Sequence, residues 1–147
     1  MRISRSGALM SQIRHISGRV FERILAKSGV DAFNGPQGRI LDVLWQEDGI
    51  SLREISNRTS LASSTLTSMI DRMECQGLLR RAPSPVDRRV TLIYLTDEAR
   101  RLREKYEDVS AGMSEIYFRG FSDTEIEKFE KALQRILENL KEEDKNE

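Results

Sequence analysis

The stretch that decides the fold is residues 51–95, SLREISNRTSLASSTLTSMIDRMECQGLLRRAPSPVDRRVTLIYL. It opens with Ser51 and Glu54, a capping-box pair in which each side chain bonds the other residue's backbone N–H and starts a short helix. We expect that helix to end near residues 58–60. Gly77 can end a second helix, at about 62–76, in the left-handed conformation. The inward side of this second helix has apolar residues at helical spacing: Leu66, Met69, Ile70 and Met73.

The residues after Gly77 change from helical to strand-like patterning. Leu78–Ala82 and Val90–Leu95 are short runs that favour β-structure. Residues 83–89, PSPVDRR, join them and contain prolines and an aspartate, which favour a loop. We therefore predict a helix-turn-helix followed by a β-hairpin, a wing whose long tip is basic.

Helices are predicted on both sides of this stretch. Residues 5–28 carry apolar side chains every three or four positions, and Asn34–Pro36 marks a turn before another short helix. A last helix starts at a second capping box, Ser122 and Glu125. Between the hairpin and that helix we expect one helix from about residue 96, which buries Leu102, Tyr106, Val109, Met113 and Ile116. The fold class is mainly α with a small β-hairpin wing.

Charge is distributed unevenly along a chain whose formal net charge is zero. Residues 1–49 carry a net charge of +2, residues 50–95 carry +3, and residues 96–147 carry −5. Every cation between Lys27 and Lys105 is an arginine, whose planar guanidinium suits phosphates and base edges. The basic middle indicates a surface that faces a polyanion, although arginines that only solvate a helical surface remain an alternative interpretation.

The second helix and the wing present groups that suit duplex DNA. A helix with small polar residues at its N-terminal end can enter a major groove. Arg88 and Arg89 at the wing tip can reach a neighbouring minor groove, where the negative potential favours arginine, or its phosphates. The polar residues on the helix are Ser63, Ser64, Thr65, Thr67 and Ser68.

The sequence resembles the MarR (multiple antibiotic resistance regulator) family without gaps from about residue 54 to 96. The combination of a recognition helix, Gly77 and an Asp-Arg-Arg wing tip at this spacing carries the resemblance. The matching segments are Glu54–Leu61, Ser63–Thr67, Ile70–Glu74, Gly77–Arg81 and Pro85–Arg89.

This resemblance implies a winged helix-turn-helix transcriptional regulator that binds a pseudo-palindromic operator as a homodimer. Residues 36–95 would be the DNA-binding domain, and residues 1–35 and 96–147 would form a helical dimerisation arm. Such proteins repress or activate nearby genes, and we expect a repressor here; the regulation is often relieved by a small ligand that is frequently phenolic or aromatic. The implied partners are therefore double-stranded DNA, a second copy of the chain and such an effector, whose binding residues the sequence does not identify.

The resemblance also implies roles for single residues. Asp87 would pair with an arginine to hold the wing, and Arg89 or Arg88 would enter the minor groove. Arg72 would be either the partner of Asp87 or a phosphate contact. Ala62 stands where the family usually has a helix-capping residue, so we expect Ser60 or Ser63 to cap instead. Because short hydroxyl side chains read bases weakly, we expect DNA shape and wing contacts to supply much of the specificity.

Other reactive side chains favour structural interpretations. Cys75 is expected to be a small buried residue rather than a redox sensor. His15 is the only histidine in the sequence, so it has no second histidine with which to build a metal site. Phe33 and Trp45 could border a ligand pocket, but packing in the core or at an interface is the favoured interpretation.

The sequence excludes several function classes. It offers no nucleophile–base pair, phosphate-binding glycine loop or metal-ligand cluster, so we expect neither an enzyme nor a cofactor or metal. It has no apolar run long enough for a membrane helix and no secretory signal. Its one cysteine cannot form an intramolecular disulfide, so we expect a protein of the reducing cytoplasm. The remaining alternative is a winged-helix protein-interaction module without DNA binding.

Overall fold

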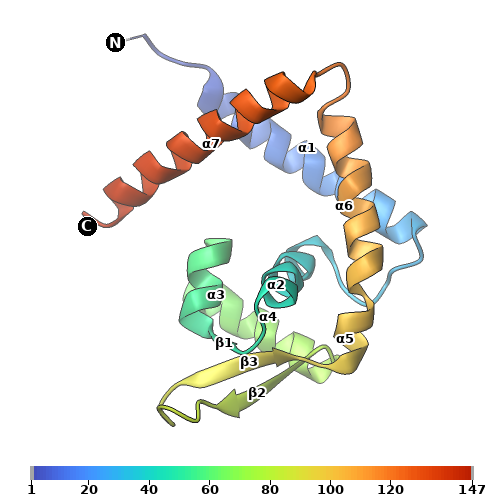
Figure 1. Ribbon diagram of the computed structural model, residues 1–147, viewed down its shortest axis with the longest axis vertical. Coiled ribbons are helices and arrows are strands. Elements are labelled where there is room, and N and C mark those ends of the chain that lie inside the picture. The colour runs from blue at the N-terminus through green and yellow to red at the C-terminus, as the bar shows by residue number, and fades with distance from the viewer. Residues whose placement is uncertain (1, 147) are drawn as a thin grey trace. The chain divides into compact units, whose positions relative to one another are not determined.

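The computed structural model describes residues 2–146, which form seven helices and a three-stranded sheet (Figure 1). The chain divides into two compact units, residues 1–110 and 111–147, which we describe separately. The elements are α1 (Ser6–Lys27), α2 (Gly35–Gln46), β1 (Ile50–Ser51), α3 (Leu52–Thr59), α4 (Ser63–Cys75), β2 (Leu79–Pro83), β3 (Thr91–Leu95), α5 (Asp97–Arg101), α6 (Arg103–Tyr117) and α7 (Asp123–Asp144). The predicted fold class, mainly α with a β-hairpin wing, is confirmed.

One hydrophobic core holds the first unit together. Each element contributes its apolar side, and burial of one such side chain stabilises the fold by about 1.5–3 kcal/mol. Because helices α2, α3 and α4 share this core with strand β3, the polar side of α4 faces outward. The most deeply buried members are Ile40, Leu41, Leu44, Ile55, Leu66, Ile70, Met73 and Ile93.

The start of α2 is fixed by a reciprocal cap and by one buried amide. Asn34 Oδ1 accepts the backbone N–H of Gln37 at 2.9 Å, and Gln37 Oε1 accepts the backbone N–H of Asn34 at 3.2 Å. Gln37 is only 3% exposed, and its Nε2 donates to Gln76 Oε1 at 3.2 Å. Because Gln76 is the C-cap of α4, this amide joins the start of α2 to the end of α4.

The sheet has the order β1-β3-β2, so the hairpin strand β3 is central. The two hairpin strands match the prediction, each starting one residue later than expected. The short strand β1, Ile50–Ser51, was not predicted. It is positioned by Asp48, whose Oδ1 accepts the backbone N–H of Leu95 at 2.9 Å. Gly49 has φ +68°, a left-handed conformation that lets the chain turn into β1 beside the ring of Tyr94.

The prediction of a single helix from residue 96 is wrong, because the helix is broken at Leu102 into α5 and α6. The carbonyl of Ala99 accepts the indole Nε1 of Trp45 at 3.0 Å and the backbone N–H of Leu102 at 3.2 Å. These two bonds tighten the turn at this point. Trp45 is thereby buried in the core, as favoured by the sequence.

The second unit contains the end of α6 and all of α7. The capping box at Ser122 and Glu125 is confirmed, with bonds of 3.2 and 3.1 Å. Ile116, expected to be buried, is 42% exposed, so that expectation is wrong. No residue of α7 is buried within the described chain. Its apolar stripe is exposed and consists of Phe129, Leu133, Ile136, Leu137 and Leu140.

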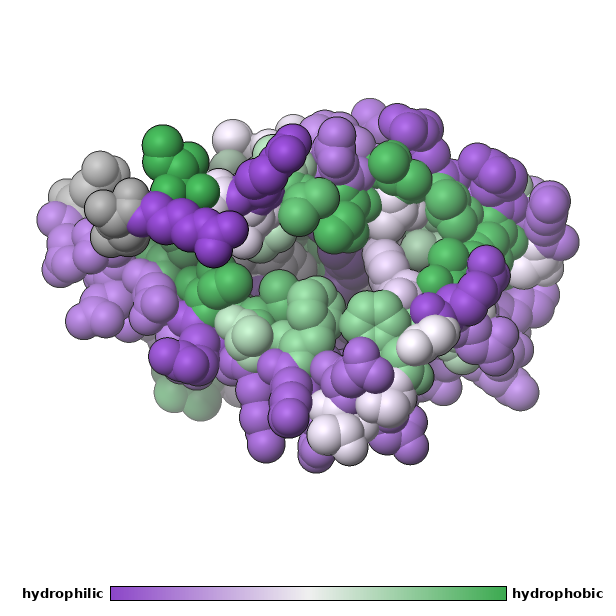
Figure 2. All heavy atoms as spheres, turned by 90° about the horizontal axis from the view of Figure 1, so that it is seen from above, coloured by the Kyte–Doolittle hydropathy of each residue, from purple (hydrophilic) through white to green (hydrophobic). Residues whose placement is uncertain are grey.

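Helix α1 also has exposed apolar side chains, at Leu9, Ile13 and Ile16. The space-filling view from above shows hydrophobic side chains gathered in patches among hydrophilic ones (Figure 2). Exposed apolar patches of this kind mark interaction surfaces. None of the helices formed by residues 2–146 is long and apolar enough to cross a membrane.

Candidate nucleic-acid interface

Helix α4 presents the predicted hydroxyl groups to solvent. Leu66, Ile70 and Met73 are buried, which fixes the rotation of the helix about its axis. Ala62 is the N-cap residue and no side chain caps α4, so the expectation that Ser60 or Ser63 does so is wrong. The five hydroxyl residues are all exposed: Ser63, Ser64, Thr65, Thr67 and Ser68.

The outward side of α4 carries two stripes of different character. Ser64, Ser68 and Arg72 are spaced four residues apart and form the first stripe. Within residues 2–146 their side chains make no hydrogen bond or ion pair, so they are available to a ligand. In the second stripe, Thr67 Oγ1 donates to the Ser63 carbonyl at 2.8 Å, and Asp71 pairs with Arg81. The first stripe is therefore the better candidate to contact DNA.

The preceding helix, α3, starts at the predicted cap but without its reciprocal bond. Ser51 Oγ accepts the backbone N–H of Glu54 at 3.2 Å. The carboxylate of Glu54 bonds Arg58 Nε at 2.9 Å instead of reaching back to Ser51, so that half of the predicted box is wrong. Arg58 also pairs with Glu47, at the end of α2. The Arg58–Glu47 pair therefore joins α3 to the end of α2.

The wing tip is an ordered turn built on Ser84, which is 9% exposed. Ser84 Oγ accepts the backbone N–H of Val86 at 3.2 Å and that of Asp87 at 3.4 Å. The backbone N–H of Ser84 donates to the Val90 carbonyl at 2.8 Å and closes the turn. Figure 1 shows the β2–β3 hairpin projecting from the first unit with this turn at its end.

Asp87 holds Arg89 in a fixed orientation at this tip. Asp87 Oδ1 accepts Arg89 Nε, and Oδ2 accepts Nη2, both at 3.1 Å, while the backbone N–H of Arg89 also donates to Oδ1. These hydrogen bonds from Arg89 hold the pKa of the Asp87 carboxyl below its ordinary value. The Arg89 side chain is nevertheless 91% exposed, and Arg88 is also exposed. Two guanidinium groups are thus displayed at the tip.

The partner of Asp87 is therefore Arg89, which confirms that the wing aspartate pairs with an arginine. Arg72 is exposed and does not pair with Asp87, so its interpretation as the structural partner is wrong. A phosphate contact is the remaining prediction for Arg72. The contacts of the nine candidate residues with DNA stay predictions.

Two arginines on β2 were missed by the sequence analysis. Arg80 lies 4.5 Å from the ring centroid of Tyr94, the residue opposite it on β3. Arg81 pairs with Asp71 and Glu74 of α4. The signal for Arg81 was present, because a charged residue interrupts the apolar positions of a short strand, but its partners lie on another element.

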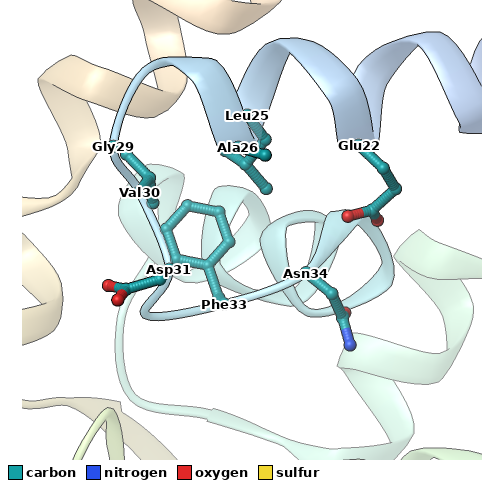
Figure 3. A pocket seen from close by; sticks show the side chains of 8 residues that line it. All are labelled: Glu22, Leu25, Ala26, Gly29, Val30, Asp31, Phe33 and Asn34. Carbon is teal, nitrogen blue, oxygen red and sulfur yellow. The ribbon is translucent and has the colours of Figure 1, made fainter.

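A pocket of about 440 Å³ lies where α1 ends and α2 begins (Figure 3). Phe33, which is 4% exposed, belongs to both the core and the pocket, whereas Trp45 does not line it. Glu22 and Asp31 put two carboxylates at the rim, and Glu22 Oε1 accepts the backbone N–H of Gly35 at 2.6 Å. The complete lining is Glu22, Leu25, Ala26, Gly29, Val30, Asp31, Phe33 and Asn34.

The other candidate reactive residues from the sequence are Cys75 and His15. Cys75 is exposed, so the expectation of a small buried residue is wrong; it follows Glu74 on the outward side of the last turn of α4. His15 is exposed on α1, with Nδ1 2.8 Å from the Ser11 carbonyl. Among residues 2–146 no group of three His, Cys, Asp or Glu side chains could hold a metal ion.

Comparison with known proteins identifies relatives that are HTH-type transcriptional regulators. The MarR family model matches residues 33–91. The HTH-type transcriptional regulator TtmR of Methylorubrum extorquens is 41% identical over 91 residues, 62% of this chain and 45% of TtmR, so the chain spans under half of that relative. The HTH-type transcriptional repressor IacR of Pseudomonas putida is 30% identical over 119 residues, 81% of this chain and 70% of IacR.

Solved structures share the same architecture. CouR from Rhodococcus jostii RHA1, bound to p-coumaroyl-CoA, superposes with a TM-score of 0.76 and 27% identity. The superposition covers 88% of this chain and 90% of CouR. The likeness therefore includes the helices on both sides of the hairpin as well as the hairpin itself.

Proposed function

Because the chain belongs to the MarR family of transcriptional regulators, we propose that it is a cytoplasmic repressor that binds a pseudo-palindromic operator as a homodimer. The chain is a winged helix-turn-helix regulator and not an enzyme, as its sequence predicts. The observation that carries the proposal is the exposed stripe of Ser64, Ser68 and Arg72, together with a wing tip that displays Arg88 and Arg89.

The two parts of this surface suit different features of a duplex. The hydroxyl stripe on α4 is narrow and uncharged until Arg72, so it can approach base edges in a major groove. The wing arginines reach a neighbouring minor groove or its phosphates. Because serine and threonine discriminate bases weakly, groove shape and wing contacts supply much of the specificity.

The dimer is supported by the apolar stripes of α1 and α7. Side chains such as Ile13 on α1 and Leu133 on α7 remain 51% and 39% exposed within the described chain. A second copy that covers them would remove this surface from water and place two recognition helices about 34 Å apart, the spacing of successive major grooves. In this proposal residues 36–95 are the DNA-binding domain, and residues 1–35 and 96–147 form the dimerisation arm.

The test measures binding to a duplex that carries the DNA upstream of the protein's own gene. Binding is measured by fluorescence anisotropy at several salt concentrations. We expect tighter binding than to a scrambled duplex of equal length and composition, because the α4 stripe reads groove features. Arg72→Ala should weaken binding to both duplexes about equally, because a phosphate contact carries no sequence information, whereas Arg135→Ala on the acidic helix α7 should weaken neither. Equal affinity for both duplexes would contradict sequence-specific regulation. If the protein binds neither DNA nor heparin at any salt concentration, a protein-interaction module without DNA binding is favoured instead.

We also propose that a small phenolic or aromatic ligand relieves this repression. The pocket beside Phe33 supports this proposal, as does the similar structure of CouR, which is bound to p-coumaroyl-CoA. The pocket is connected to α4 by the bonded chain Asn34, Gln37 and Gln76. Because Glu22 and Asp31 lie at its rim, a neutral phenol fits better than an aromatic carboxylate.

Adding 4-methylphenol or p-coumarate to the protein–DNA complex tests the effector class. We expect the neutral phenol to release DNA at lower concentration than the carboxylate, and Phe33→Leu to raise the concentration needed. If neither compound alters affinity for the duplex, the phenolic class of effector is wrong. DNA binding by the ligand-free protein is tested separately by the salt titration.

A further inference from the structure

Arg81 occupies a position in the wing where the strand pattern calls for an apolar side chain. It lies on β2, at the edge of the sheet, directly opposite Ile93 of β3, which is fully buried. Residues opposite each other in an antiparallel pair point to the same face. Leu79, two residues earlier on β2, points to that face as well and is 2% exposed. An arginine is therefore placed on the side of the hairpin that faces the helices.

The guanidinium of Arg81 is engaged by two carboxylates of the recognition helix. Nη2 lies 2.5 Å from Asp71 Oδ1, and Nη1 lies 2.9 Å from Glu74 Oε1. Asp71 and Glu74 are one helical turn apart on α4, which matches the fork of a single guanidinium. The Arg81 side chain is 28% exposed, less than either partner. One side chain thus bridges the wing and the recognition helix.

This bridge also controls charge beside the DNA-facing stripe. The side chains of Asp71 and Glu74 are 61% and 41% exposed and lie on the same helix as Arg72. Without a cation between them they would place two negative charges next to a surface that has to approach phosphates. Exposed ion pairs add little to the stability of a fold, so the placement of Arg81 is explained better by geometry and charge than by stability.

We propose that Arg81 is a positioning residue for DNA binding: its bridge to Asp71 and Glu74 sets the wing at a fixed angle to α4 and neutralises the carboxylates there. The inference rests on the proposed function, because it assigns Arg81 a role in the same interface. Arg81 acts through the wing tip, so the contribution of Arg89 to DNA affinity depends on the intact ion pairs of Arg81 with Asp71 and Glu74.

The test is a double-mutant cycle between Arg81 and Arg89, read as affinity for the duplex from the protein's own upstream DNA. Arg81→Met keeps the aliphatic stem and removes the charge, and Arg89→Ala removes the wing contact. We expect Arg89→Ala to weaken binding about tenfold in the wild-type background and under about threefold with Arg81→Met, because a misplaced wing has less contact to lose. Arg81→Lys, which keeps one charge but not the fork, should lie between.

A purely structural role would give a different result. If Arg81→Met only reduced the folded fraction, the two substitutions would act independently and the same fold-change for Arg89→Ala in both backgrounds would overturn the proposal. Urea unfolding of each variant measures the folded fraction directly. If Arg81→Met does not fold, the pair Asp71→Asn with Glu74→Gln removes the bridge from the other side and enters the same cycle.

A second measurement does not need DNA. Hydrogen exchange of the wing amides at residues 84 and 86–90 should be faster in Arg81→Met than in the wild type, while exchange in α2 stays unchanged. Unchanged wing exchange would refute the fixed angle. If the wild-type protein does not bind the duplex at all, the proposed function fails, and this exchange measurement still decides whether Arg81 holds the wing.

Discussion

Replacing Arg89 with alanine tests whether the wing tip meets the phosphates of a duplex. The side chain is 91% exposed and its protein contacts are those with the neighbouring Asp87. Removing it should leave the fold intact, because no buried group loses a partner. Any change in DNA affinity can then be assigned to the interface.

The expected magnitude follows from counterion release. Each phosphate contact contributes about 0.9 to the slope of log affinity against log salt, so a dimer that loses one contact at each wing loses about 1.8. Between roughly 50 and 200 mM salt, a fourfold change, the ratio of wild-type to variant affinity should therefore shrink by about twelvefold. The variant is weaker at low salt and approaches the wild type as salt rises.

The assay is anisotropy of a labelled duplex at four or more salt concentrations, with urea unfolding as a control for stability. Arg135→Ala on α7 is the matched control, because it removes the same charge from a helix that is proposed to contact the second copy of the chain and not DNA. Parallel lines for the wild type and Arg89→Ala would refute the phosphate contact. A reduced slope with Arg135→Ala as well would show that net charge, rather than the wing, sets the salt dependence.

Three further outcomes test other parts of the structure. Leu133→Glu on the apolar stripe of α7 should convert a dimer to a monomer in light scattering, whereas Glu130→Gln should not; an unchanged mass would remove α7 from the interface. Ser122→Ala should lower the free energy of unfolding by about 1 kcal/mol, because it breaks the cap of α7, with Ser114→Ala as control. Burial raises the pKa of the Asp42 carboxyl, so Asp42→Asn should stabilise the fold at neutral pH. That advantage should shrink as pH falls through the raised pKa toward 3.8, the ordinary value, and a gap independent of pH would contradict it.

The sequence predicted elements whose signals are local. Ser122 and Glu125 carry their capping box within four residues, and Gly77, with φ +78°, ends its helix as a glycine in a left-handed conformation does. The hairpin strands followed from β-favouring residues on each side of a proline-containing loop. Such features depend on neighbouring residues alone, so a single sequence contains them.

Features set by distant residues were missed or wrong. The break at Leu102 depends on the indole of Trp45, which is far away in the chain, and β1 exists because β3 provides a partner. Glu54 bonds Arg58, so its predicted bond to Ser51 is lost to a competing cation. Cys75 is exposed because the rotation of α4 is fixed by the core, not by the character of the thiol.

The candidate site shows the same division and explains where specificity arises. Ser64 and Ser68 could be selected from the sequence because hydroxyl residues cluster there, but hydroxyls distinguish bases poorly. A regulator with such a helix needs discrimination from the position at which its wing meets the neighbouring groove. That position is controlled by Arg81, whose partners lie seven and ten residues away on another element. The weaker the recognition helix is as a reader of bases, the more a fixed wing angle contributes to the choice of operator.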